Sequence, residues 1–331
     1  MGNLLPKISV VIPLFNKESY IERAISSIRI QDIADIEIIV IDDGSTDNGK
    51  NIVEAIPDGR IKVISQENQG VSVARNAGIN AATSDLIAFL DSDDEWKPGF
   101  LQTIFSLRER FPNAGAYGTS YETPVRGGKT YRPIFDGLPQ GWEGILPSYF
   151  RSSFGMHVLH TSAVAIPKAV FDTVGGFKIG EKLGEDLDMW LRIALRFPIA
   201  YSNVQQSVYH QEAGNRTDGL PVSVDKLPYL IRAEEMLRSG CVPDHLRDDL
   251  IDYVASRKIG YAKRFIKLGQ SANARLLLAE IKSKRFAQKK QLWLLLSFIP
   301  KIFFELLRSL KWHVYSVSKS MQKYINSTKV K

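Results

Sequence analysis

The chain has 331 residues, of which 44% are hydrophobic and 24% charged, a composition that argues against intrinsic disorder and is sufficient for a large buried core. Its single cysteine, Cys241, excludes an internal disulfide, fits a reducing compartment and is expected to be a small buried residue. Residues 282–331 contain twelve Lys or Arg and one Glu, a balance of +11, so residues 1–281 are at −4 within the total of +7.

Strand-like runs alternate with helical patterns over the first hundred residues. Residues 8–12 (ISVVI) form a β-branched run, and Ile21, Ala24, Ile25 and Ile28 then recur with the spacing of one helical face. The same order repeats, with strands expected at 37–41, 62–65 and 86–90 and helices near 48–55, near 71–82 and after Pro98. Apolar strands that alternate with amphipathic helices indicate an α/β fold with a parallel sheet covered on both faces.

Acidic residues collect where these strands end. The first strand ends in PLFN (13–16), the second in DDGSTD (42–47) and the fourth in DSDDE (91–95). Ligands of open α/β sheets bind beyond such carboxyl ends. No glycine-rich dinucleotide or phosphate loop follows the first strand. An acidic edge that faces a phosphorylated ligand therefore indicates a divalent cation, Mn²⁺ or Mg²⁺, between the two.

Four stretches, in this order, resemble the successive motifs of family-2 glycosyltransferases with the GT-A fold, over about residues 7–200. They are ISVVIPLFNKESYIERAISSI, IEIIVIDDGSTD, NQGVSVARNAGINAATSDLIAFLDSDDEWKPGFL and GGFKIGEKLGEDLDMWLRIA. The resemblance implies a Rossmann-like, mostly parallel sheet with helices on both faces, and a nucleotide-sugar donor.

The resemblance also implies which residues bind the donor. Asp42 and Asp43 fall where the family binds the ribose and uracil of its usual donors. Phe15 stands where the family often has Tyr next to the base, and an ordinary core Phe is the alternative. Arg75 matches an arginine that contacts the nucleotide, with a simple ion pair as the alternative. The full expected donor set is Pro13, Phe15, Asp42, Asp43, Arg75, Asp91 and Ser92.

Residues 91–93 look like the family's D-x-D element. By this resemblance Asp93 coordinates the metal, and Asp91 contacts ribose, metal or metal-bound water. The next two acids, Asp94 and Glu95, are interpreted as residues of a solvated turn or helix cap. His210 is a candidate for a further metal ligand or phosphate contact, together with Arg216, and a structural histidine is the alternative.

The stretch GEDLDMW (184–190) matches the family's E-D element. Transfer of a sugar requires a base for the acceptor hydroxyl, and Asp186 is the expected base. Glu185 and Asp188 either orient it or are ordinary first-turn acids. With one base and no evident carboxylate nucleophile, the resemblance implies single displacement with inversion at the anomeric carbon.

The C-terminal segment combines basic charge with a broad apolar face. In QLWLLLSFIPKIFFELLRSLKW the polar residues Ser297, Lys301, Glu305 and Arg308 form one narrow stripe, and the longest unbroken apolar run is 292–296. That run is far shorter than the roughly 20 residues that span a bilayer. The pattern favours a helix in the interface of an anionic membrane, with packing on the protein or in a homo-oligomer as the alternative. Nucleic acid is not an expected partner.

We therefore expect a GT-A domain at 1–222, a helical region at 223–286 and a basic amphipathic, membrane-associating tail at 287–331. The expected activity is metal-dependent inverting transfer from a UDP-sugar to a lipid-linked or cell-surface glycan. The expected location is cytoplasmic, peripheral at the inner face of the cytoplasmic membrane. The Q-x-x-R-W element of processive polymerases is absent, which favours single additions. The alternative is an inactive glycan-binding or nucleotide-sugar-binding module, which predicts loss of Asp93 or Asp186, and both are present.

Overall fold

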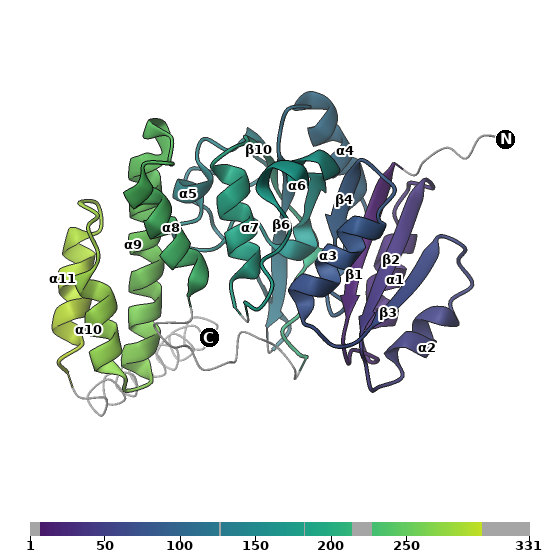
Figure 1. The fold of residues 1–331 in the computed structure, drawn as a ribbon, viewed down its shortest axis with the longest axis horizontal. Helices are drawn as coiled ribbons and strands as arrows, with labels where there is room; N and C mark the ends of the chain where they lie inside the picture. Colours follow the sequence, from purple (N-terminus) through teal and green to yellow (C-terminus); the bar gives the residue numbers. More distant parts are fainter. Residues whose placement is uncertain (1–6, 126, 182, 214–226, 300–331) are drawn as a thin grey trace, which may run out of the picture. The chain divides into compact units, whose positions relative to one another are not determined.

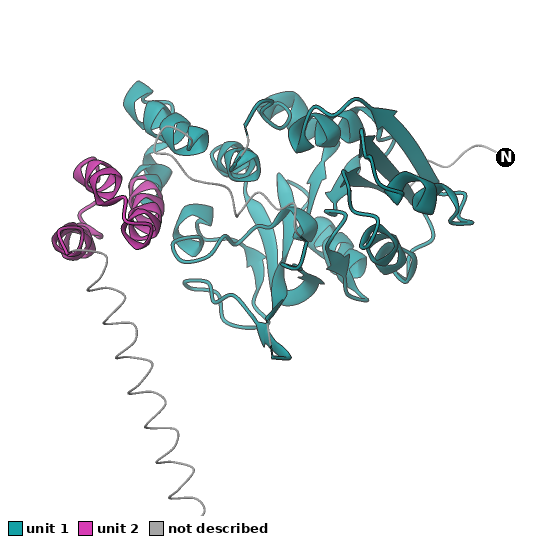
Figure 2. Cartoon of the chain, turned by 90° about the horizontal axis from the view of Figure 1, so that it is seen from below, with its two compact units in different colours: residues 1–250 teal, residues 251–331 magenta. Residues whose placement is uncertain are grey.

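The computed structural model describes residues 7–125, 127–181, 183–213 and 227–299 (Figure 1). The chain divides into two compact units, residues 1–250 and 251–331 (Figure 2). The predicted boundary at 222/223 and the predicted tail beyond residue 299 lie outside the described residues, so the predicted domain limits stay predictions. Cys241 is exposed, so the prediction of a buried cysteine is wrong.

Unit 1 contains a mixed sheet to which ten strands of the described residues contribute, in the order β3-β2-β1-β4-β9-β6-β10-β5, with β7 beside β6 and β8 beside β10. The strands are β1 (Ile8–Leu14), β2 (Ile36–Asp43), β3 (Ile61–Gln66), β4 (Leu86–Phe89), β5 (Glu95–Trp96), β6 (Ala116–Val125), β7 (Lys129–Tyr131), β8 (Glu143–Ile145), β9 (Val164–Pro167) and β10 (Ile199–Val208). The helices of this unit that lie before residue 240 are α1 (Ile21–Arg29), α2 (Gly49–Glu54), α3 (Val71–Ala81), α4 (Phe100–Arg110), α5 (Tyr149–Ser152), α6 (Lys168–Val174), α7 (Glu185–Ala194) and α8 (Pro228–Ser239).

The first four strands pair in parallel, as the alternating pattern predicts. Beyond β4 the sheet differs from a purely parallel one, because β9 pairs antiparallel with both β4 and β6. Strand β10 returns to the common direction beside β6, whereas β5 and β8 run antiparallel to β10. The α/β fold class is thus confirmed, with parallel pairing among the first four strands and several reversed strands in the second half of the sheet.

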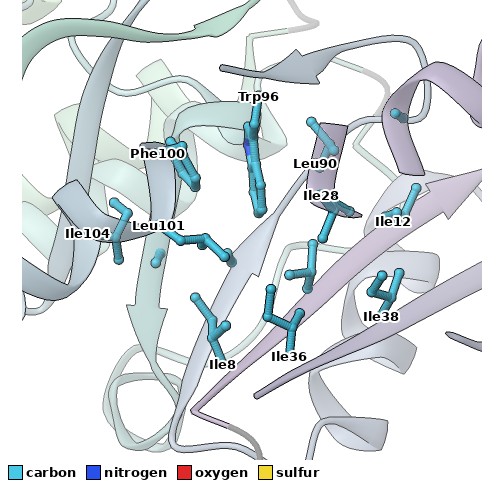
Figure 3. Close-up of a cluster of buried hydrophobic side chains, with 14 of the residues drawn as sticks. Ile8, Ile12, Ile28, Ile36, Ile38, Leu90, Trp96, Phe100, Leu101 and Ile104 are labelled. Atoms are coloured by element: carbon cyan, nitrogen blue, oxygen red, sulfur yellow. The ribbon is translucent and has the colours of Figure 1, made fainter. Parts of the chain in front are cut away.

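The core of unit 1 lies on both faces of the sheet. All seven residues of β1 are buried, as expected for a strand covered on both sides. Alternate residues of β1, including Ile8 and Ile12, pack with α1 and α4 on one face (Figure 3). Helix α3 packs against β1 and β2 on the other face, toward which Val11 points.

Unit 2 is helical and includes most of α9 (Asp244–Lys267), α10 (Ser271–Ala279) and α11 (Ala287–Leu296). Lys258 in α9 donates to Glu280 at 2.5 Å, and Ser283 donates to Asp252 at 2.5 Å, so polar contacts join α9 to the residues after α10. This confirms the expected C-terminal helices. Within the part of the chain that the structure describes, no helix has both the length and the apolar character that a membrane crossing requires.

The close approach of α3 to β1 depends on Gly78. A Cβ at this position would lie 2.2 Å from Val11 Cγ1 and 2.9 Å from Val11 Cγ2. Val11 is fully buried and cannot move aside without disturbing the sheet. The absence of a side chain at Gly78 therefore sets how near α3 lies to the strand, and with it the position of every residue that α3 contributes to the sheet edge.

We predict opposite effects of Gly→Ala at two helical positions. Gly260 lies in α9, where a Cβ would meet open space, so Gly260→Ala should raise the free energy of unfolding by up to about 1 kcal/mol through helix propensity. Gly78→Ala should lower it by about 1–2 kcal/mol, because overpacking outweighs the same propensity gain. Urea unfolding measures both. A stabilised Gly78→Ala protein would contradict the packing described for α3.

Candidate active site

The predicted donor residues lie together at the carboxyl edge of the parallel strands. Leu14 in β1 pairs with Asp42 in β2, and Val11 in β1 pairs with Phe89 at the end of β4. The segments that follow β1, β2 and β4 therefore leave the sheet at the same edge. Pro13 is buried within β1, and Ser92 is buried between the two D-x-D aspartates.

Asp43 joins the end of β2 to the start of α3. Its Oδ1 accepts from Gln66 Nε2 at 2.7 Å and from the Gln69 N–H at 3.0 Å. Its Oδ2 accepts from the N–H of Gly70, the residue before α3, at 2.8 Å. Asp43 is buried, so its contacts fix where α3 begins; its predicted contact with the base stays a prediction.

Two other predicted donor residues differ in their exposure. Asp42 is buried and accepts from the N–H of Ser45 at 3.1 Å, which shapes the turn after β2. Phe15 is 40% exposed, so the alternative of an ordinary core phenylalanine is wrong. Stacking of its ring on a base stays a prediction.

Arg75 joins the D-x-D element to the E-D element. Its guanidinium donates to Asp91 Oδ1 at 2.8 Å and to Glu185 Oε1 at 2.9 Å, and the side chain is only 4% exposed. The ring of Phe177 lies 5.2 Å from the guanidinium carbon. Burial opposes the charge of Arg75, but the charges of Asp91 and Glu185 outweigh it and raise the pKa of this arginine. Arg75 is therefore an ion-pair residue in this structure. Its predicted contact with the nucleotide stays a prediction.

The neighbouring residue Asn76 holds the segment that leads to α7. Its side-chain amide donates to the carbonyl of Phe177 at 2.8 Å and accepts from the Phe177 N–H at 2.8 Å. A Cβ on Gly176 would lie 2.4 Å from Asn76 Oδ1, so glycine at 176 allows this close contact. Helix α3 therefore places the Arg75 guanidinium beside Glu185 and, through Asn76, holds the backbone at Phe177, which precedes the E-D element.

The D-x-D element faces two basic side chains of the first motif. Lys17 Nζ lies 2.7 Å from Asp93 Oδ2, and Arg23 Nη2 donates to the Asp93 carbonyl at 2.6 Å. Burial would raise the pKa of Asp91, but Arg75, with smaller contributions from His160 and Lys17, lowers it. Both D-x-D carboxylates therefore lie beside cationic groups of the chain itself.

Asp94 is not a residue of a solvated turn, and that interpretation is wrong. Its side chain is 1% exposed and accepts from Ser162 Oγ at 2.6 Å and from the His210 N–H at 2.9 Å. Burial, followed by the charges of Asp91 and Asp93, raises the pKa of Asp94. Asp94 thus connects the D-x-D turn to the segments that contain Ser162 and His210.

The His210 side chain contacts Glu95. Its Nε2 is 3.1 Å from Glu95 Oε1, and this hydrogen bond is the main cause of a lowered pKa of Glu95. The role of His210 as a metal ligand stays a prediction. Arg216, its predicted companion, lies outside the described residues.

Asp186 lies in the first turn of α7 and is partly buried there. Burial, with the charge of Glu185, raises the pKa of Asp186 to about 7, although Arg75 and a hydrogen bond from the Leu187 N–H oppose this shift. Asp188 is fully buried and accepts from Arg192 at 2.7 Å and from Arg232 at 2.5 Å. Asp188 therefore anchors α7 against α8, whereas the raised pKa of Asp186 lies near neutral pH.

Comparison with known proteins decides the family. Residues 9–171 match the family model of glycosyl transferase family 2. The chain therefore carries a family-2 glycosyltransferase domain. An uncharacterized glycosyltransferase of Nostoc sp. is 50% identical over 105 residues, which are 30% of this chain and 32% of that protein. The GalNAc(5)-diNAcBac-PP-undecaprenol β-1,3-glucosyltransferase of Campylobacter jejuni is 42% identical over 104 residues, 30% of this chain and 34% of that protein. The chain thus matches about a third of the length of these curated relatives.

The chain also resembles a solved structure. S. aureus TarS 1–349, crystallised in complex with UDP-GlcNAc, superposes with a TM-score of 0.67 at 21% identity, over 86% of this chain and 88% of that one. At this identity the likeness concerns the fold, and it confirms the expected GT-A class.

The carboxylates of the family-2 domain fit a divalent cation that is shared with a substrate. Among the described residues no three His, Cys, Asp or Glu side chains are arranged to hold a metal ion by themselves. Mg²⁺ is usually held by one or two carboxylates together with substrate phosphates. The Lys17 ammonium, 2.7 Å from Asp93, shows that a cation can be accommodated at this carboxylate. Asp93, with Asp91 nearby, is therefore a suitable donor set for Mn²⁺ or Mg²⁺.

Two residues of this site, Lys17 and His160, are not among those predicted from the sequence. Lys17 directly follows PLFN, and its position just after a strand end could have indicated that it belongs to the site. His160 lies close enough to Asp91 to lower the pKa of that carboxyl, and its ring is 4.4 Å from that of Tyr209. No motif in the sequence points to His160, because its proximity to Asp91 arises only from the fold.

We predict that Arg75→Gln destabilises the protein by about 3 kcal/mol, because it leaves two partly buried carboxylates without their cation. Arg132→Gln is the control: Arg132 is 59% exposed in its pair with Glu122, and its loss should cost less than about 0.5 kcal/mol. Urea denaturation at pH 7.5 compares the two variants. Equal effects would contradict the role given to Arg75.

Proposed function

We propose that the chain is a metal-dependent, inverting glycosyltransferase that transfers one sugar at a time from a UDP-sugar to a hydroxyl of a lipid-linked or cell-surface glycan. The observation that carries the proposal is Asp186, a carboxyl whose pKa is raised to about 7 beside the Arg75 ion pairs. A general base is most effective when its pKa is near the working pH. The family-2 match supports the reaction class.

The proposed reaction needs one displacement and one proton transfer. Asp186, as carboxylate, accepts the proton of the acceptor hydroxyl while that oxygen bonds to the anomeric carbon and the bond to the diphosphate breaks. Its neighbours Glu185 and Asp91 are both paired with Arg75, so neither is the stronger candidate for base or nucleophile. A single base without a nucleophile supports inversion at the anomeric carbon.

Asp93, with Asp91, would hold the divalent cation, Mn²⁺ or Mg²⁺. When bound, such a cation stabilises the negative charge of the departing diphosphate. A UDP-sugar is proposed because TarS, which has the same fold, was crystallised with UDP-GlcNAc, and a lipid-linked acceptor because the name of the C. jejuni relative includes undecaprenol diphosphate. The inactive binding module is disfavoured, because Asp93 and Asp186 are both present at the site.

We also propose a peripheral location at the cytoplasmic face of an anionic membrane, through the C-terminal basic segment. In the described part of that segment, Leu292, Leu295 and Phe298 are 53%, 69% and 66% exposed. Lys289 and Lys267 are close enough to Lys263 for their charges, after burial, to lower the pKa of Lys263. Exposed apolar side chains beside a cluster of positive charge are typical of an interfacial helix.

We predict that Asp186→Asn reduces transfer by at least about 10²-fold, the scale of losing a general base, and leaves UDP binding within about twofold. In the wild type, transfer should rise with pH through about 7 as Asp186 loses its proton. Sugar transfer and UDP titration are measured with the exposed Asp172→Asn as control. Unchanged transfer by Asp186→Asn would contradict the assignment.

The same substitution should stabilise the protein at alkaline pH. Because the folded-state pKa of Asp186 is raised, the folded protein holds this proton more tightly than the unfolded chain, so stability falls as pH rises from about 4 to about 7. Asn cannot ionise, and Asp186→Asn should therefore increase Tm relative to wild type at pH 8 but not at pH 4. Thermal unfolding at the two pH values measures this difference, and a lowered Tm at pH 8 would count against it.

We predict that Leu292→Glu/Leu295→Glu weakens binding to anionic lipid vesicles at least about tenfold, because two exposed apolar side chains are replaced by repelled charges. Ile179→Glu changes an equally exposed apolar residue, 69% accessible, in the other unit and should leave binding unchanged. Vesicle co-sedimentation measures both. If the intact protein does not bind the vesicles, and the double variant differs from it in oligomeric state, the segment is a contact between copies of the chain.

A further inference from the structure

Lys17 is held in a defined place directly beside the D-x-D element. It lies between β1 and α1, and its carbonyl accepts from the N–H groups of Tyr20 and Ile21, which fixes its backbone at the start of the helix. Its ammonium is 2.7 Å from Asp93 Oδ2, and the two side chains are only 11% and 13% exposed. This is a shielded ion pair, in contrast to the exposed Lys50–Glu54 pair at 3.8 Å.

The local charges explain why a cation is needed there. Asp91, Asp93 and Asp94 lie within four consecutive residues, and the side chain of Asp94 is only 1% exposed. Arg75 is already engaged by Asp91 and Glu185, and Arg23 donates to the Asp93 carbonyl and to Glu212. Lys17 is thus the described cation that contacts the Asp93 carboxylate itself.

The properties of lysine suit an exchangeable contact. Lysine is a compact point charge on a flexible four-carbon stem, whereas arginine forms a rigid, planar fork. The Lys17 ammonium donates to the Asp93 carboxylate and lies 6.0 Å from the centre of the Tyr20 ring. Arg23, in contrast, donates to two groups and is anchored by both. Lys17 can therefore leave its carboxylate with little rearrangement of the backbone.

We propose that Lys17 is the counter-ion of Asp93 in the donor-free protein and moves to the donor diphosphate when donor and divalent cation bind together. The proposal rests on the proposed function, because it requires Asp93 to be the metal-binding carboxylate. While Lys17 neutralises Asp93, the protein binds a divalent cation weakly by itself. Once released, the ammonium can bind the phosphate oxygens, for which lysine is a common ligand. One side chain thereby couples binding of the cation to binding of the nucleotide.

Loss of Lys17 should change two affinities in opposite directions: the affinity for Mn²⁺ alone should rise, and the affinity for UDP in the presence of Mn²⁺ should fall. Mn²⁺ alone is titrated into the nucleotide-free protein and followed by electron paramagnetic resonance. UDP is then titrated by calorimetry at saturating Mn²⁺. Lys17→Gln should bind Mn²⁺ alone about tenfold more tightly than wild type, because a competing cation is gone. It should bind UDP with Mn²⁺ about tenfold more weakly, because a charged phosphate contact is lost.

Matched variants show where the change arises. Lys50→Gln removes an exposed lysine of α2 and should change neither affinity. Adding Asp93→Asn to Lys17→Gln should abolish the gain in Mn²⁺ affinity, because the competed carboxylate is then absent. Lys17→Arg retains the charge and should stay near wild type in the titration with Mn²⁺ alone.

The outcomes distinguish this inference from the proposed function. If the wild type binds UDP with Mn²⁺ but Lys17→Gln shows unchanged, weaker or undetectable binding of Mn²⁺ alone, the role of Lys17 is overturned and the proposed function stands. The role of Lys17 is also overturned if the variant that combines Lys17→Gln with Asp93→Asn still binds Mn²⁺ alone more tightly than the wild type. If the wild type does not bind UDP with Mn²⁺ at all, the proposed donor chemistry fails, and the coupling role fails with it.

Discussion

The site depends on one buried arginine that is shared by two carboxylates. Arg75 donates to Asp91 at 2.8 Å and to Glu185 at 2.9 Å, and thereby connects helix α3, the end of β4 and the start of α7. Arg75 and Glu185 are 110 positions apart in the sequence. Without a cation between them, the acidic groups would repel one another in a poorly solvated region. The arginine therefore makes it possible to gather the D-x-D and E-D elements at one edge of the sheet.

This arrangement also explains why neighbouring carboxyls differ in their protonation. Asp91 and Glu185 are paired with Arg75, and the pKa of Asp91 is lowered. Asp186 interacts with Arg75 only through its charge, which does not offset burial and the charge of Glu185, so its pKa is raised to about 7. Environments that separate the pKa values of adjacent acids are typical of acid–base sites. The packing that holds Arg75 in place, including the Gly78–Val11 approach, is thus part of the chemistry as well as of the fold.

Much of the fold follows from hydrophobic periodicity, and the rest depends on distant contacts. The first four strands and their helices are visible in the sequence, because β-branched runs and helical spacing alternate there. Strand β9 (Val164–Pro167) is only four residues long and pairs antiparallel between two other strands, an insertion that no local pattern specifies. In the site, motif resemblance predicts a metal-binding role for Asp93 and the role of general base for Asp186. It misses the burial of Asp94 and the contact of Lys17 with Asp93, because both arise from residues about 70 positions or more apart.

The ionisation of Asp186 is the property that most directly tests how this site works. Carboxyl ¹³C chemical shifts of the aspartate-labelled protein, assigned with Asp186→Asn, give the titration of this side chain in the absence of donor. Burial together with the charge of Glu185 predicts an apparent pKa of about 7 for Asp186. A titration near 3.9, the ordinary value for aspartate, would contradict it, because Asp186 would then be a solvated carboxylate and not a base set by burial beside the Arg75 pairs.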